Sequence, residues 1–98
     1  MYGYSLIGQG YCGDYTYLPD GKYPERLNAG KASYDSDPIK ECLNRCLDSY
    51  GKNTGQGKIG NQGFYLRSSD SRCACAIGAC TLTSSKKYLS YKISSGKH

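Results

Sequence analysis

The sequence predicts a small α+β domain in which one helix packs on a mainly antiparallel sheet and disulfide bonds join the two. Three observations support this prediction. Residues from about 38 to 50 keep a helical apolar period, shorter segments alternate as strands do, and six cysteines occur in 98 residues. A chain this short buries a modest fraction of its surface, so we expect one domain, 1–98, whose core needs covalent support.

The helix is the most clearly delimited element of the sequence. Asp37 is a favourable N-cap, Pro38 suits the first helical position, and Gly51 can adopt the left-handed conformation that ends a helix. The apolar residues fall on one stripe, and two of them are cysteines whose sulfurs would point at the sheet. The stripe consists of Ile39, Cys42, Leu43, Cys46, Leu47 and Tyr50.

Before the helix, the sequence predicts one strand and an irregular crossing. Residues 2–6 alternate as a first strand, which residues 8–10 interrupt with glycines before residues 11–12 resume it. Residues 13–37 contain Pro, Gly, Asn and Asp without a sustained period, so we expect a loop-rich segment with a short strand near residues 15–18.

After the helix, residues 52–62 are rich in glycine and amide side chains and predict a flexible loop outside the core. Two strands joined by a turn follow at residues 63–67 and 72–77, and a last strand at residues 88–93 comes after a polar run. We expect the first and last strands to lie close together and residues 94–98 to form a disordered tail. The hairpin can lie under the helix, with its cysteines opposite Cys42 and Cys46. The residues that alternate onto one face of their strands are Phe64 and Leu66, then Cys73, Cys75 and Ile77, and finally Leu89, Tyr91 and Ile93.

The cysteines indicate the compartment in which the protein works. An even number in a short chain without Trp favours a disulfide framework, and therefore a secreted, extracellular or cell-surface protein. The alternative is a zinc site built from four thiolates, although C-x3-C and C-x-C spacings differ from the usual C-x2-C knuckle. We expect no metal and no other cofactor. The cysteines are Cys12, Cys42, Cys46, Cys73, Cys75 and Cys80.

No segment approaches the roughly 20 apolar residues that a membrane-spanning helix requires. The N-terminus also lacks the charged and apolar regions of a signal peptide. If the protein is secreted, we therefore expect this chain to be a mature or excised form.

Basic residues concentrate in the second half of the chain, whose overall net charge is +5. Residues 1–49 carry five basic and seven acidic side chains, whereas residues 50–98 carry eight basic and one acidic. In an oxidising compartment, such a surface would bind acidic polysaccharides or acidic proteins rather than nucleic acid. The alternative to an anion-binding site is a set of solvated lysines that serve only solubility. The candidates are Lys52, Lys58, Arg67, Arg72, Lys86, Lys87 and Lys92, with Tyr88 next to the Lys86–Lys87 pair.

Tyrosine dominates the aromatic residues, with eleven Tyr, one Phe and no Trp. Most of these rings, including Tyr50, Tyr65 and Tyr91, are expected to fill a small core with their hydroxyl groups at the surface. Exposed rings can instead stack on sugars or anchor a protein interface. The candidates for that role precede the helix: Tyr15, Tyr17, Tyr23 and Tyr34.

Catalysis has little support in this sequence. The only histidine is His98, near the chain end, and no nucleophile–base set can form around it. The aspartates that could be drawn as an acid–base pair or a calcium site lie in turns and caps, as such residues usually do. They are Asp14, Asp20, Asp35 and Asp37. We therefore expect a non-catalytic protein.

The segments Glu41-Cys42-Leu-Asn-Arg-Cys46 and Gln62-Gly-Phe-Tyr65 resemble the helix and the following strand of the PAN/apple superfamily. The cysteine that precedes the Phe in that family is absent, and Cys73-x-Cys75 occurs instead. Adapted to this pattern, the resemblance implies that Cys42 and Cys46 pair with Cys73 and Cys75, and Cys12 with Cys80. It also implies a recognition module without catalytic activity, because PAN/apple domains generally bind proteins or carbohydrates.

Our leading hypothesis is an extracellular binding module. Its ligand would be either a carbohydrate, acidic carbohydrates included, or another protein, and cell adhesion is one process in which such a module would act. The loops at residues 13–36 and 52–62 would carry recognition. Two alternatives remain: a small cationic secreted effector, such as a toxin, antimicrobial or signalling protein, and a structural component of a matrix or adhesive. Oligomeric state is not indicated by the sequence.

Overall fold

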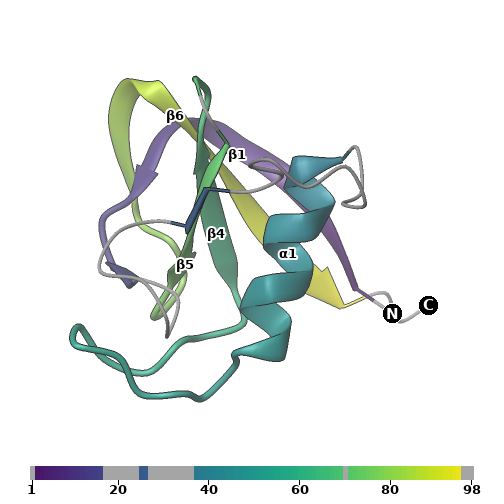
Figure 1. Ribbon diagram of the computed structural model, residues 1–98. Coiled ribbons are helices and arrows are strands. Elements are labelled where there is room, and N and C mark those ends of the chain that lie inside the picture. The colour runs from purple at the N-terminus through teal and green to yellow at the C-terminus, as the bar shows by residue number, and fades with distance from the viewer. Residues whose placement is uncertain (1, 17–24, 27–36, 70, 96–98) are drawn as a thin grey trace.

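The computed structural model describes residues 2–16, 25–26, 37–69 and 71–95 (Figure 1). One helix packs against an antiparallel sheet, so the predicted α+β class is confirmed. In chain order, the elements are β1 (Tyr2–Cys12), β2 (Tyr15–Thr16), β3 (Glu25–Arg26), α1 (Pro38–Asp48), β4 (Gly63–Arg67), β5 (Arg72–Ala76) and β6 (Leu82–Ser95).

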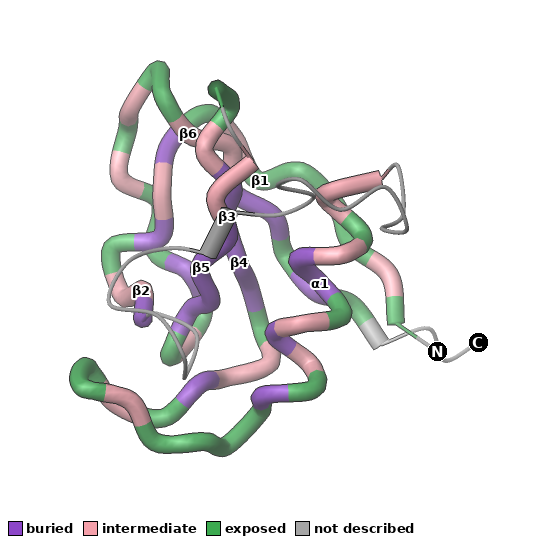
Figure 2. The backbone as a smooth tube through the Cα atoms, viewed as in Figure 1, coloured by how far each residue is buried: buried purple, intermediate pink, exposed green. Residues whose placement is uncertain are grey.

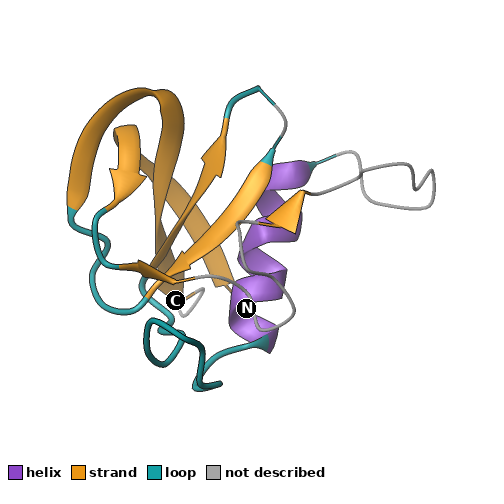
Figure 3. Cartoon of the chain, turned by 60° about the vertical axis from the view of Figure 1, so that its left-hand side comes forward, coloured by secondary structure: helices purple, strands orange, loops and turns teal. Residues whose placement is uncertain are grey.

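The strands follow one another across the sheet in the order β1-β6-β4-β5-β2, and β3 also pairs with β5. Each of these pairs is antiparallel. The first and last strands are neighbours, as predicted. The helix lies along one face of the sheet, and Figure 3 shows it (purple) beside the strands (orange).

The ends of α1 follow from its terminal residues. The Asp37 carboxylate Oδ1 accepts the backbone N–H groups of Ile39 at 3.1 Å and Lys40 at 3.2 Å, and Pro38 occupies the first turn. Gly51 has a φ of 82°, so the chain turns there as expected. The helix itself ends at Asp48, two residues before the predicted limit. Tyr50 therefore leaves the apolar stripe and is 60% exposed, which corrects its assignment to the core.

The main core lies between α1 and the sheet. Figure 2 shows buried residues concentrated in β4, β5 and the sheet-facing side of the helix. Phe64 is fully buried, and its ring stacks on that of Tyr91 with 5.3 Å between the centroids. The buried members of this cluster are Cys42, Leu43, Cys46, Ile59, Phe64, Leu66, Cys73, Cys75, Tyr91 and Ile93. Ile77 was expected here, but β5 ends at Ala76 and Ile77 is 37% exposed.

Three disulfide bonds hold the layers together: Cys42–Cys73, Cys46–Cys75 and Cys12–Cys80. The family resemblance implies the Cys12–Cys80 bond and two bonds between the helix cysteines and Cys73 and Cys75, and the structure determines which of these cysteines pair. Two of them fasten α1 to β5, and the third joins β1 to the segment before β6. Since all six cysteines are bonded, none of their thiolates is available for the alternative zinc site.

β6 is longer than predicted, whereas β1 has the interrupted course that its glycines predict. β1 continues through Gly8–Gly10 by means of irregularities between Leu6 and Gly8 and between Gln9 and Gly10. At Gly10, φ is 153° and a Cβ would lie 2.2 Å from the Thr83 carbonyl oxygen, so this strand approaches its neighbour only because glycine is present. β6 begins at Leu82 rather than near residue 88 because Leu82, Thr83 and Ser84 pair with Cys12, Tyr11 and Gly10 of β1.

The C-terminal end of β6 and the loop after the helix also differ from expectation. Ser94 and Ser95, assigned to the tail, pair with Gly3 and Tyr2, and residues 96–98 lie outside the described ranges. The loop at 52–62 contains a bridge between Asn53 and Lys58. Ile59 follows this bridge and is only 1% exposed, so the loop does contribute to the core.

Candidate ligand-binding face

The sheet has a second buried cluster on the face opposite α1, which we call the helix-free face. Residues alternate between the faces, so Tyr65 lies opposite its neighbours Phe64 and Leu66 on β4. On β5, Ala74 and Ala76 alternate in the same way with the disulfide-bonded cysteines. The small alanine side chains leave space above this part of the sheet, and tyrosine rings occupy it.

Four tyrosines from four strands form this aromatic cluster: Tyr11 of β1, Tyr15 of β2, Tyr65 of β4 and Tyr88 of β6. Tyr65 is central and 3% exposed; its ring centroid lies 5.2 Å from that of Tyr88, 5.8 Å from Tyr15 and 6.1 Å from Tyr11. The ring planes meet at steep angles, as edge-to-face contacts do. Together the rings line a hollow of about 270 Å³.

Asp14 holds the turn beside this cluster. Its carboxylate accepts the backbone N–H groups of Gly78 at 2.8 Å, Cys80 at 3.3 Å and Thr81 at 3.1 Å. These bonds fasten the turn after β1 to the segment between β5 and β6, and they position Tyr15 at the start of β2. Asp14 therefore acts as a structural acceptor, while Asp20 and Asp35 lie outside the described residues.

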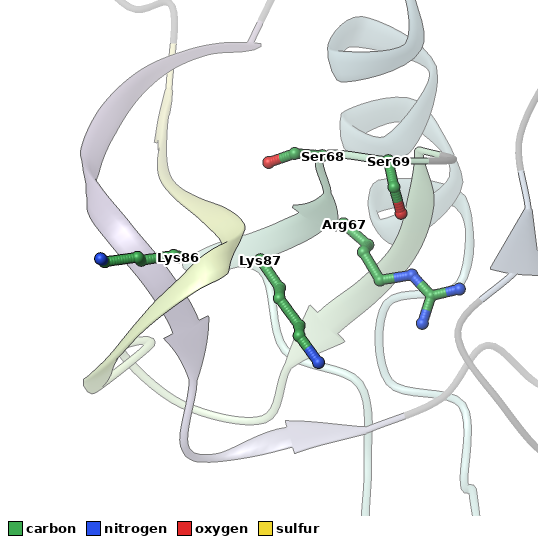
Figure 4. A pocket seen from close by; sticks show the side chains of 5 residues that line it. All are labelled: Arg67, Ser68, Ser69, Lys86 and Lys87. Atoms are coloured by element: carbon green, nitrogen blue, oxygen red, sulfur yellow. The ribbon is translucent and has the colours of Figure 1, made fainter.

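A cationic hollow of about 490 Å³ lies next to the tyrosines, lined by Arg67, Ser68, Ser69, Lys86 and Lys87 (Figure 4). In Figure 4 the Arg67 guanidinium and the Lys87 ammonium point to the same side of the strands, whereas Lys86 points away from them. The Ser68 N–H donates to the Lys87 carbonyl at 2.9 Å, which fixes the spacing of the two strands here.

Strands β4 and β6 contribute side chains to both hollows. Tyr65 and Arg67 are two residues apart on β4, and Arg67 pairs in register with Tyr88 of β6. Aromatic and cationic side chains are thus presented together. A ligand with a ring and an anionic substituent would find a matching group at each place.

The predicted candidates divide into three groups. Tyr15, Tyr88, Lys86 and Lys87 lie at the two hollows. Lys52 and Lys58 are exposed in the loop after the helix and line neither hollow. Among the other cationic candidates, Arg67 lines the cationic hollow, whereas Arg72 and Lys92 line neither hollow. The tyrosine candidates Tyr17, Tyr23 and Tyr34 lie outside the described residues.

Sequence reasoning missed two members of the aromatic cluster. The prediction that Tyr65 fills the core is confirmed, since it is 3% exposed, but its contacts with the other tyrosines were not predicted. For Tyr11 the sequence predicts only its place in a strand. The alternation of β4 contained the signal, since a residue between Phe64 and Leu66 must face away from the helix. The position of Tyr11 could not be anticipated in this way, because it depends on the irregular register between β1 and β6.

On the helix side, a tyrosine pair is coupled to the helix N-terminus. The Tyr4 hydroxyl donates to the Asp37 carboxylate at 3.5 Å, and its ring lies 5.6 Å from that of Tyr91. Burial, followed by the Asp37 charge, raises the pKa of Tyr4. Burial, followed by Tyr4 and Asp37, raises the pKa of Tyr91. Both phenols are therefore neutral at physiological pH.

Comparison with protein-family models, curated proteins and solved structures gives no match for this chain. In the part of the chain that the structure describes, no helix is both long and apolar enough to cross a membrane.

Proposed function

We propose that this protein is an extracellular, non-catalytic module that binds an acidic carbohydrate on its helix-free face. The observation that carries the proposal is the tyrosine-lined hollow beside the hollow of Arg67 and Lys87. The three buried disulfides support an oxidising compartment, because such bonds persist outside the cytosol. The resemblance to PAN/apple domains remains a prediction that agrees with this class of function.

The tyrosine hollow suits one sugar ring. Its volume of about 270 Å³ is just below the range of roughly 300–1,000 Å³ that is typical of small-molecule sites. Aromatic rings offer apolar contact area with little conformational freedom to lose, and their hydroxyl groups can bond to sugar hydroxyls. Tyr11, Tyr15 and Tyr88 are half-buried, so each presents part of its ring while its neighbours hold it in place.

The cationic hollow suits a sulfate or carboxylate on that sugar or on the adjoining one. Arg67 can bind such a group through its planar guanidinium, and Lys87 adds a second positive charge from the neighbouring strand. The Ser69 hydroxyl lines the same hollow and can donate a further hydrogen bond. An acidic sugar is therefore favoured over a neutral one.

A glycan array containing sulfated, uronic and neutral members tests the proposal, with each hit measured at low and high salt. We expect acidic glycans to bind and to weaken as salt rises, because the cations are solvent-accessible. Lys87→Gln should lower affinity severalfold, and Lys86→Gln, which removes the same charge from a side chain that points away, should lower it less. Binding of acidic proteins but no glycan would instead identify a protein-recognition module.

Three results would reject the carbohydrate assignment. The first is the absence of any glycan ligand, and the second is equal affinity for neutral and acidic members. The third is growth inhibition or membrane leakage by the isolated protein, which would favour the cationic-effector alternative.

A further inference from the structure

The two ends of the sheet differ in how well they are protected from pairing with another chain. At one end, β2 has only two residues. At the other end, β1 has eleven residues, of which none is charged and none is proline. Sheet edges are usually protected by charge, by proline, by bulges or by short length. β1 uses only bulges, and these lie beyond Leu6.

The segment Tyr2–Leu6 of β1 is regular, exposed and apolar. It pairs with Ser95–Tyr91 of β6 without interruption. Leu6 is 60%, Tyr2 48% and Tyr4 36% exposed, and the three alternate along the strand, so they share one face of the sheet. In the part of the chain that the structure describes, β6 is the only strand that pairs with β1.

We propose that this edge pairs with the same edge of a second copy of the chain, and that the protein forms a two-fold symmetric dimer. An antiparallel pair of Tyr2–Leu6 segments centred on Tyr4 sets Tyr2 opposite Leu6 of the partner subunit. It also sets Tyr4 opposite Tyr4 of the partner subunit. The exposed Tyr and Leu side chains then form one apolar row across the two-fold axis.

An identical copy suits this edge for electrostatic reasons. Two chains with a net charge of +5 repel each other, and the repulsion is weakest where uncharged strands meet. β1 carries no charged side chain, so a second copy can pair with this edge without placing like charges directly opposite each other.

The symmetry also explains why assembly would stop at two chains. In an antiparallel pair each β1 covers the other, so neither copy keeps a free β1 edge. The outer ends of the joined sheet are then formed by β2 and β3, of two residues each, which are too short to continue the ladder. The axis runs through the sheet from face to face, so both helix-free faces point to the same side. If the proposed function holds, the dimer presents two sugar sites to one surface.

Sedimentation analysis of the whole chain from micromolar to millimolar concentration tests the dimer. We expect the average mass to rise from 10.7 kDa toward twice that value. Leu6→Lys should remain monomeric because it sets a cation in the apolar row. Tyr50→Lys is the matched control: Tyr50 is also 60% exposed and lies on the loop after α1, so this variant should dimerise like the wild type. Wild-type protein that stays monomeric throughout, or a Leu6→Lys variant that still dimerises, would overturn the proposal.

Hydrogen exchange of the wild-type protein provides a second test that needs no substitution. Backbone N–H groups of Tyr2–Leu6 that point away from β6 should exchange more slowly in concentrated than in dilute solution. The loop at residues 52–58 should show no such change. Protection that grows with concentration in this loop instead of in Tyr2–Leu6 would show that another surface is the interface, and the proposal would be wrong.

Discussion

The two faces of the sheet are built from the same strands but are closed in different ways. On the helix face, α1 covers the strands and two disulfides fasten it, so Phe64, Cys73 and Cys75 are fully buried. On the helix-free face, tyrosine rings from four strands cover the alanines and leave a hollow beside two cations. The helix face stabilises the fold, and the helix-free face, which is built on the same strands, can hold a ligand-binding site.

Removal of disulfide bonds should have the largest effect on the free energy of unfolding. Replacing Cys12 and Cys80 together by Ala opens the longest loop, with a sequence separation of 68, and should reduce the free energy of unfolding by about 4 kcal/mol in the chain-entropy model. Replacing Cys46 and Cys75 should cost less, about 2 kcal/mol, because the adjacent Cys42–Cys73 bond still closes nearly the same loop. Urea unfolding measures both. Equal losses would mean that strain, rather than loop closure, determines the contribution of each bond.

A deletion in the helix-face core should be the next largest effect. Leu66→Ala removes a side chain that is 5% exposed and leaves a cavity beneath α1, so we expect a loss of about 3 kcal/mol in the free energy of unfolding. Glycan affinity of the folded fraction should be unchanged. If Leu66→Ala weakens binding as much as it weakens folding, the two faces are coupled and the division drawn above is wrong.

Tyr88→Ala should show the reverse pattern. Tyr88 is half-buried, so its loss affects folding less than the loss of Leu66. Removal of a ring from the sugar hollow should nevertheless weaken glycan binding by about 2 kcal/mol, roughly thirtyfold in Kd. Calorimetric titration with an array hit measures this change. Unchanged affinity would place the sugar site away from the tyrosine cluster.

The helix cap predicts a smaller effect on stability. Asp37→Ala removes the acceptor of two backbone N–H groups and should reduce stability by about 1 kcal/mol. Asp37→Asn is the matched control, because asparagine caps helices about as well but lacks the charge. Similar losses in both variants would indicate that the charge, through Tyr4 or the helix dipole, matters more than the cap.

The smallest predicted effect is a loss of stability at alkaline pH. The folded-state pKa values of Tyr4 and Tyr91 are raised above 10.0, so their contribution is complete below pH 10 and is lost as pH rises through the raised values. Thermal unfolding between about pH 8 and pH 11 should show a shallower decline for Tyr4→Phe than for the wild type. An identical decline would mean that ionisation of Tyr4 is not linked to folding.

Much of the fold could be predicted because its signals are local. Asp37, Pro38 and Gly51 determine the ends of the helix through neighbouring backbone groups. Alternation places Phe64 and Leu66 on one face whatever the partner strand is. Some errors occurred where long-range contacts decide: β6 extends back to Leu82 because it pairs there with β1, and Ile59 is buried because its loop returns to the core. Others lie just beyond the ends of α1 and β5, where the apolar pattern continues past the element and Tyr50 and Ile77 are exposed.

The candidate site could be predicted only in part, for the same reason. Lys86, Lys87 and Tyr88 are adjacent in the sequence, so their clustering was visible there. The convergence of Tyr11, Tyr15 and Tyr65 on Tyr88 was not, since it joins four strands that are distant along the chain.

The sequence by itself determined the class of fold, the helix and its cap, the faces of the central strands and the need for disulfides, because these depend on residue type and short spacing. Three features depend on the folded chain as a whole: which tyrosines meet, where the cations lie beside them, and the position of β1 at the edge of the sheet. Those features depend on strand order and register, which are set by the packing of the whole chain and not by any one segment.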